Sequence, residues 1–180
     1  MLHFERIAPQ HPSYSWMEQI WESSFPPEER RATAEQRQRS KKTPIFHTDL
    51  IHHNQQPIGL IYWWELERFR YIEHFAIAPQ YRNKHYGSQT IQTFCQQDTS
   101  PLLLEVEPAT DQLTLRRIHF YKALGFTLHA NYTYLQPPYP GKKEAVPLQL
   151  MTWGEKTSVT DLQQLTTELK IKVYGHRGIL

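Results

Sequence analysis

The pattern of apolar and polar positions changes period several times along the chain, and each change marks a predicted element. Short apolar runs bounded by turn residues predict strands over residues 2–7, 45–53, 58–66, 71–78, 101–106, 126–135 and 146–153. Apolar residues at helical spacing predict helices over 13–24, 87–97, 113–124 and 160–173, and a charged segment predicts a further helix over 28–39. This order predicts a mixed α/β (α+β) fold with a mostly antiparallel central sheet flanked by helices.

Length and composition narrow the possibilities. The chain has 180 residues, 39% of them apolar, which predicts one domain over residues 1–180. Lysine and arginine number 20 against 18 acidic residues, so we expect neither a nucleic-acid nor a membrane partner. The longest apolar run, residues 58–64, is far shorter than the ~20 residues of a membrane span. The first residues lack the basic-then-apolar pattern of a signal peptide, so we expect a cytoplasmic location.

Cysteine and histidine usage adds two expectations. Cys95 is the only cysteine and lies on the apolar stripe of a predicted helix, so we expect a buried thiol in a reducing compartment. The ten histidines show no spacing typical of metal ligands, and we expect no metal.

Residues 71–94 carry the most informative pattern. An apolar strand leads into the basic turn 82–87, and an amphipathic helix with Ile91, Phe94 and Cys95 on one face follows at once. A turn between a strand and a helix N-terminus presents free backbone N–H groups and the positive end of the helix dipole. We therefore expect this turn to bind phosphate, although the lysine-serine pair of a Walker loop is absent.

The residues of this turn resemble the acyl-CoA-binding motif of the GNAT acyltransferase superfamily. In that motif an apolar residue and a proline lead into Arg/Gln-x-x-Gly-x-Gly/Ala; here residues 77–79 (IAP) precede Arg82-x-x-His85-x-Gly87. His85 stands where the family usually has its first glycine. Glycine permits close approach of a phosphate, and a histidine fits there only if its backbone is helical and its ring points outward.

Residues 104–126 carry a second pattern that resembles the same superfamily. The run 120–126, FYKALGF, matches the family's FY-x-x-x-GF, and Tyr121 matches the tyrosine that commonly lies beside the CoA sulfur. Thr114 stands seven residues earlier, where the family often has an asparagine that contacts the CoA arm. Two motifs in the family's order are far more specific than either one alone.

The resemblance covers most of the chain and implies both fold and activity. It implies a mixed sheet splayed between its fourth and fifth strands, with acetyl-CoA as cosubstrate in the opening. It implies transfer of an acetyl group to a primary amine of a small molecule or peptide, by direct attack in a ternary complex. The alternative is a GNAT-fold module that binds acyl-CoA without catalysis, as a sensor or interaction domain. A homodimer through the helix 160–173 stays open.

The implied reaction needs a base and an acid. A lysine-like amine must lose a proton before it attacks, which costs about 4.6 kcal/mol at neutral pH. Glu73 is the predicted base, because burial in an apolar strand would raise its pKa; the equal alternatives are a salt bridge to Arg68 or Arg70, or a solvated side chain. Tyr121 is the predicted acid for the departing thiolate, with packing inside the helix as its alternative.

Backbone groups are expected to bind much of the cosubstrate. If the sheet splays, the N–H groups of Phe75, Ala76 and Ile77 become donors for the thioester carbonyl and the pantetheine amides. The phosphates are expected to bind the turn residues Arg82, Asn83, Lys84, His85, Tyr86, Gly87 and Ser88.

The acceptor site is the least specified part of the sequence. Glu28, Glu105 and Glu107 are candidates to attract a cationic substrate, and Tyr134 is a candidate wall residue. Glu105 and Glu107 also compete with Glu73 as the base, although solvated surface positions are the commoner fate of such carboxylates. His74 is expected to point to the opposite face of its strand from Glu73, as a buried core histidine.

Overall fold

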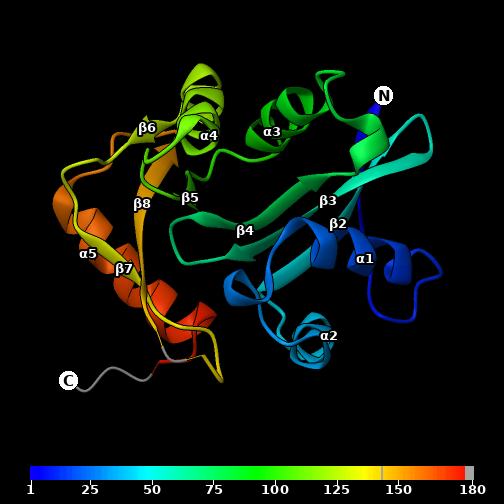
Figure 1. The fold of residues 1–180 in the computed structure, drawn as a ribbon, viewed down its shortest axis with the longest axis horizontal. Helices are drawn as coiled ribbons and strands as arrows, with labels where there is room; N and C mark the ends of the chain where they lie inside the picture. Colours follow the sequence, from blue (N-terminus) through cyan, green and yellow to red (C-terminus); the bar gives the residue numbers. More distant parts are fainter. Residues whose placement is uncertain (143, 177–180) are drawn as a thin grey trace. The chain divides into compact units, whose positions relative to one another are not determined.

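The protein is described by a computed structural model, shown in Figure 1, in which residues 1–142 and 144–176 are described. The chain divides into two compact units, Met1–Thr99 and Ser100–Leu180. The predicted single domain and the predicted splay between the fourth and fifth strands both stay predictions.

The first unit is built on an antiparallel sheet whose strands follow one another in the chain. Its order is β1 (Leu2–Arg6), β2 (Phe46–His53), β3 (Gln56–Glu65) and β4 (Arg70–Ile77). β2, β3 and β4 are almost continuously buried because helices cover both faces: α1 (Tyr14–Ser24) and α2 (Thr33–Lys42) on one, α3 (Tyr86–Gln96) on the other (Figure 1). Trp21 of α1 packs on Tyr62, whereas Phe94 of α3 packs on Trp63, the next residue of β3.

The predicted helix over 28–39 is wrong in its first part. Pro27–Glu29 form a short 3₁₀ helix, η1, the backbone at Arg30 is extended with φ −145° and ψ 161°, and α2 begins only at Thr33. The Arg30 guanidinium stacks 5.0 Å from the Trp21 ring, and its Nε donates to the carbonyl of Phe25 at 3.0 Å. These inward contacts favour the extended backbone over a continuous solvated helix.

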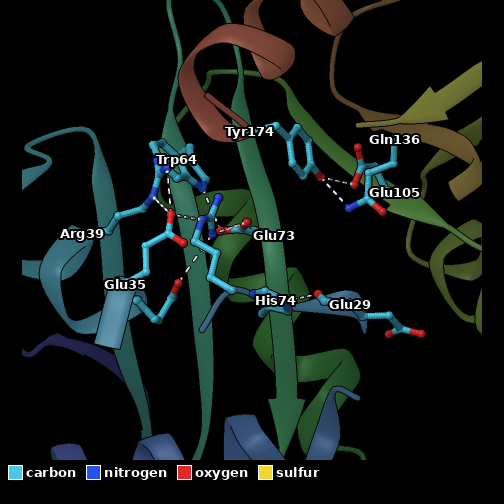
Figure 2. Close-up of polar contacts among 11 residues, drawn as sticks. Glu29, Glu35, Arg39, Trp64, Glu73, His74, Glu105, Gln136 and Tyr174 are labelled. Carbon is cyan, nitrogen blue, oxygen red and sulfur yellow. Dashed lines mark hydrogen bonds and ion pairs between the residues drawn. The ribbon is translucent and has the colours of Figure 1, made fainter. Parts of the chain in front are cut away.

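A β-bulge at Glu73 changes which way the side chains of β4 point. Tyr62 pairs with His74 but Trp63 pairs with Ile72, so Glu73 is an extra residue opposite β3. The side chains of Glu73 and His74 consequently both reach the segment of residues 29–31. His74 Nε2 donates to the carbonyl of Glu29 at 3.1 Å, and Glu73 accepts from Arg31 (Figure 2). The expectation that His74 points to the opposite face is therefore wrong, whereas its burial in the core is confirmed.

The second unit is organised around β8 (Val146–Trp153). β5 (Leu102–Val106), β6 (Thr127–Leu128) and β7 (Tyr134–Gln136) each pair with β8 in antiparallel fashion. The predicted strand over 126–135 is wrong as a single strand, because the chain turns through residues 129–133 between β6 and β7. The helices are α4 (Gln112–Ala123) and α5 (Val159–Glu168), which continues into a wider π-helical turn, η3 (Leu169–Val173).

Several local expectations have clear outcomes. The mixed α/β class with mostly antiparallel pairing is confirmed. Ile91, Phe94 and Cys95 are buried, and burial raises the pKa of the Cys95 thiol to about 11. The predicted apolar stripe of α4 fails at Leu113, which is 66% exposed, because α4 turns Thr114 and Ile118 inward instead. None of the helices in the described part of the chain is both long and apolar enough to cross a bilayer.

Arg70 fastens the end of α3 to β4 and should contribute measurably to stability. Its buried guanidinium donates to the carbonyls of Phe94 at 2.9 Å, Cys95 at 3.4 Å and Asp98 at 3.2 Å, at and just beyond the C-terminus of α3. We expect Arg70→Met to lower the free energy of unfolding in urea by about 1–3 kcal/mol. Arg116→Met, at an exposed position, is the matched control and should change it by less than about 0.5 kcal/mol. Equal stabilities of the two variants would contradict this role.

His74 should make stability depend on pH. Burial lowers its pKa to about 4, whereas in the unfolded chain an imidazole titrates near 6.5. Between these values only the unfolded chain takes up the proton, so stability is complete above pH ~6.5 and falls as the pH drops toward ~4. Between pH 7.5 and 5, we expect the wild type to lose about 2 kcal/mol more than His74→Gln in urea unfolding. An identical loss in both proteins would show that His74 does not control it.

Candidate functional site

The turn that joins β4 to α3 has a backbone conformation that few residue types adopt. After a short 3₁₀ helix, η2 (Pro79–Tyr81), both Asn83 and His85 have positive φ, 59° and 61°. This left-handed conformation costs most residues other than glycine about 1–2 kcal/mol. The backbone at His85 is therefore left-handed rather than helical, a conformation that glycine adopts without strain. The His85 side chain is exposed.

The turn presents a row of free backbone donors. The N–H groups from Asn83 to Ser88 have no hydrogen-bond acceptor among the residues that the structure describes. The first N–H with a partner inside the helix is that of Gln89, which donates to the carbonyl of His85 at 3.1 Å. These donors lie at the N-terminus of an eleven-residue helix, whose dipole is positive there. The geometry fits the anion-binding role that the sequence predicts for this turn.

The side chains of the turn hold its shape and add positive charge. Arg82 Nε donates to the carbonyl of Ile77 at 2.9 Å, and Lys84 Nζ donates to the carbonyl of Gln80 at 3.2 Å. The ring of Tyr86 packs 4.8 Å from that of His53, at the end of β2. Ser88 Oγ donates to the carbonyl of His85 at 2.9 Å. Both cationic side chains thus lie along the turn that carries the free N–H groups.

The side of β4 that faces away from β3 carries further donors. The N–H of Ala78 donates to the carbonyl of Ile58 at 2.9 Å. Since hydrogen bonds alternate along an antiparallel pair, Ala76 points its N–H toward β3, while Phe75 and Ile77 point theirs away from β3. The carbonyl of Ile77, which accepts from Arg82, agrees with this assignment. Among the predicted donors of this strand, Phe75 and Ile77 fit, but Ala76 does not.

Tyr121 of α4 keeps a hydroxyl that no residue in the described part of the chain accepts from or donates to. Its ring lies 5.1 Å from that of Phe120 and 5.4 Å from that of Phe126, in edge-to-face contacts that fix its direction. Desolvation raises its pKa to about 12, only partly offset by Arg117. The phenol is therefore protonated at neutral pH and can donate a hydrogen bond.

Thr114 is already used in the N-terminal cap of α4. Its N–H donates to Asp111 Oδ1 at 2.7 Å, and its hydroxyl accepts from the N–H groups of Thr110 and Asp111 at 3.2 and 3.1 Å. The hydroxyl proton also has acceptors within the cap, at 3.1 and 3.0 Å on Asp111. The structure therefore gives Thr114 a capping role. Because its hydroxyl already has partners in the cap, a further contact from this hydroxyl to the CoA arm is hard to combine with that role.

Glu73 does not have the properties expected of a base. Its side chain and that of Arg31 are both fully buried, with 2.5 Å between Arg31 Nη1 and Glu73 Oε1, and Trp64 Nε1 donates to its other oxygen at 2.9 Å (Figure 2). Burial alone would raise the pKa of Glu73, but attraction to Arg31 and His74 and these hydrogen bonds outweigh it and lower the pKa. The expectation of a raised pKa is wrong, because the partner is Arg31 rather than Arg68 or Arg70. The place of Arg31 inside the charged segment 28–39 gave no signal that its side chain is buried.

The second unit holds the other candidate carboxylates. Both oxygens of Glu105 on β5 accept from phenols, one from Tyr134 and one from Tyr174 at 2.7 Å, and Gln136 Nε2 donates to the Tyr174 hydroxyl at 2.7 Å (Figure 2). Burial and the charge of Glu105 raise the pKa of Tyr134 far above its usual range. Tyr174 and Gln136 were not predicted, because single residues outside a recognised motif carry no pattern.

Two further carboxylates lie at the surface. Glu107 pairs with Arg117 at 2.6 Å, with both side chains nearly half exposed. Glu28 is exposed on η1 and has no partner within the described residues. Neither environment assigns a chemical role by itself.

The chain matches known proteins over most of its length. The family described as Acetyltransferase (GNAT) family matches residues 13–126. A solved structure from Bacteroides thetaiotaomicron, assigned to the acetyltransferases of the GNAT family, is 35% identical; the match covers 97% of this chain and 99% of that one, with a TM-score of 0.93. No curated protein matches the chain.

More distant structures share the fold. The ribosomal-protein-S18-alanine N-acetyltransferase of Escherichia coli is 16% identical, with a TM-score of 0.54 over 88% of this chain and 98% of that one. Arabidopsis thaliana NAA60, solved in complex with acetyl-CoA, is 15% identical, with a TM-score of 0.61 over 85% and 98%. Since the family match spans more than half of the sequence and the Bacteroides protein matches nearly all of it, the chain belongs to the GNAT acetyltransferase family.

Proposed function

We propose that this protein transfers the acetyl group of acetyl-CoA to a primary amine of a small molecule or peptide, by direct attack in a ternary complex. The observation that carries the proposal is the set of backbone donors on one unit: the outward N–H groups of Phe75 and Ile77, and those from Asn83 to Ser88. Such donors suit, in this order, the amide and carbonyl oxygens and the phosphates of an acyl-CoA. The fold is shared with an N-acetyltransferase and with a protein solved with acetyl-CoA, which supports the same choice.

The chain's own groups divide the work of the reaction. Acetyl-CoA supplies an acetyl group activated as a thioester. Phe75 N–H or Ile77 N–H donates to the thioester carbonyl, where negative charge develops during attack. The turn residues Arg82 and Lys84 add charge near the phosphates. Glu105, both of whose oxygens already accept from phenols, and Glu107 are the remaining carboxylates that we propose to receive the proton of the amine.

Tyr121 is our candidate donor to the departing sulfur. A free thiol has a pKa of about 8.5, so complete proton transfer from a phenol at about 12 is uphill by roughly 5 kcal/mol. The difference between the two pKa values is larger than it would be for a phenol with the ordinary pKa of about 10. We therefore propose that Tyr121 stabilises the thiolate chiefly through a hydrogen bond, and that the thiol takes its final proton from water.

The direct test is a thiol-release assay with acetyl-CoA and a panel of spermidine, free amino acids, aminoglycosides and peptides with free N-termini. Release that depends on one class of amine supports the proposal. Acetyl-CoA binding by calorimetry without release for any amine would favour a non-catalytic acyl-CoA-binding module. Absence of acetyl-CoA binding would contradict both functions.

Removing the Tyr121 hydroxyl should slow turnover more than it weakens binding. We expect Tyr121→Phe to lower kcat by roughly tenfold to a hundredfold, because one donor to a developing charge is lost. The Kd for acetyl-CoA, measured by calorimetry, should change by less than about threefold, since binding rests on the backbone donors. Tyr14→Phe removes a phenol hydroxyl that contacts Ser40 and should leave kcat unchanged. An unaltered kcat in Tyr121→Phe would remove Tyr121 from the mechanism.

The residue at position 85 should matter through its backbone conformation. His85→Gly relieves the left-handed strain, so we expect stability to rise by up to about 1 kcal/mol and acetyl-CoA to bind within about threefold of the wild type. Valine resists positive φ, so His85→Val should shift the turn and weaken acetyl-CoA binding by about tenfold in calorimetry. Wild-type affinity in His85→Val would show that the turn's backbone does not bind the cosubstrate.

A further inference from the structure

Residues 27–29 of the segment 27–31 are exposed, yet the segment is held in one place. η1 buries none of its residues, so no apolar core of its own fixes the segment. Arg30 and Arg31 follow it in an extended backbone before α2 begins. A short exposed segment of this kind is expected to move unless specific contacts restrain it.

Two consecutive residues of the β4 bulge provide those contacts. His74 Nε2 donates to the carbonyl of Glu29 at 3.1 Å, and Glu73 accepts from Arg31 at 2.5 Å. The lowered pKa of His74 keeps the imidazole neutral at physiological pH, so its Nε2 carries a proton for this bond. In a regular strand these two side chains would point to opposite faces, and only one of them would reach the segment.

Arg31 is surrounded by further groups that fix its direction. Its guanidinium lies 5.5 Å from the ring of Trp64, its Nη1 is 3.5 Å from Gln36 Oε1, and its Nε is 3.9 Å from Glu35 Oε1. Arg39 pairs with the same Glu35 at 3.2 Å, and its guanidinium lies 5.6 Å from the centre of the Trp64 ring (Figure 2). The guanidinium is therefore oriented as well as buried.

A buried ion pair is a poor device for stability alone. Desolvation of both ions offsets much of their attraction, and an apolar pair of similar size often stabilises a fold equally well. The ion pair instead fixes a position, because a bond between Arg31 and Glu73 holds residues 29–31 at one place along β4. That position is next to Phe75, whose N–H points outward from the strand.

We propose that Arg31, Glu73 and His74 are positioning residues for the acceptor amine. They hold segment 27–31 beside the β4 edge where the thioester binds, so that the approaching amine meets a fixed surface that includes the exposed carboxylate of Glu28. This inference rests on the proposed acetyl transfer. It replaces a role for Glu73 as base with a role that acts through Arg31 and the segment.

Steady-state kinetics separate the two roles of Glu73. With spermidine or a free-N-terminus peptide as acceptor, whichever the wild type acetylates, we expect Arg31→Met and Glu73→Gln each to raise the KM for the amine about tenfold. The Kd for acetyl-CoA and the shape of the pH-rate profile should not change. Arg37→Met, which breaks the ion pair between Arg37 of α2 and Glu18 of α1, is the matched control and should leave the amine KM unaltered.

Different outcomes would overturn the proposal. If Glu73→Gln abolishes turnover at an unchanged amine KM, or flattens the acidic limb of the pH-rate profile, while Arg31→Met stays active, Glu73 is a base. If neither variant alters the amine KM, the segment does not position the acceptor. Should Arg31→Met not fold, Arg31→Lys keeps the charge but loses the planar fork, and it should raise the amine KM by a smaller factor.

Amide hydrogen exchange gives a readout that does not need an acceptor. In Glu73→Gln we expect faster exchange at residues 28–32, with exchange in α3 unchanged. His74→Gln keeps a donor near the carbonyl of Glu29 and should exchange more slowly there than His74→Leu. Unchanged exchange in all three variants would show that Glu73 and His74 do not hold segment 27–31. If the wild type acetylates no amine but the exchange pattern holds, these residues do hold the segment and the proposed function fails.

Discussion

The extra residue in β4 is the constraint on which the rest of the first unit depends. With Glu73 inserted opposite β3, two neighbouring side chains turn to the same face, and a buried ion pair and a histidine bond fasten residues 29–31 there. The register beyond the bulge then determines that Phe75 and Ile77, rather than Ala76, direct their N–H groups away from β3. One local irregularity thus determines both the position of residues 29–31 and which N–H groups of β4 point away from β3.

The phosphate-binding turn depends on backbone shape more than on side-chain identity. Asn83 and His85 take up a left-handed conformation that glycine adopts without strain, and the donors that follow are left without acceptors in the described residues. A histidine at the motif's glycine position therefore preserves the turn at a modest energetic cost. The departure from the family motif changes a side chain that points to solvent and leaves the arrangement of N–H groups in place.

The sequence predicted elements well where periodicity is strong and failed where one tertiary contact decides the conformation. The apolar runs of β2, β3 and β4 and the stripe of α3 were clear, because burial on repeated positions leaves a regular pattern. The break at residues 30–32 was missed, since Arg31 looks like a solvated helix residue until Glu73 draws it inward. The prediction of a raised pKa for Glu73 failed for the same reason, because its partner Arg31 lies 42 positions away and leaves no local signal in the sequence. The phosphate-binding turn was indicated by its strand, basic turn and helix pattern, whereas the expected roles of Tyr121 and Thr114 came only from resemblance to a family.

The central claim is that backbone N–H groups of β4 and the following turn bind acetyl-CoA. Nuclear magnetic resonance tests it directly, by titrating ¹⁵N-labelled protein with acetyl-CoA and following each amide. The largest shifts should fall on Phe75 and Ile77 and on the residues from Asn83 to Ser88, with a small shift at Ala76, whose N–H is bonded to β3. Saturable binding that leaves those amides unshifted, or that shifts Ala76 as strongly as its neighbours, would contradict the assignment of the site.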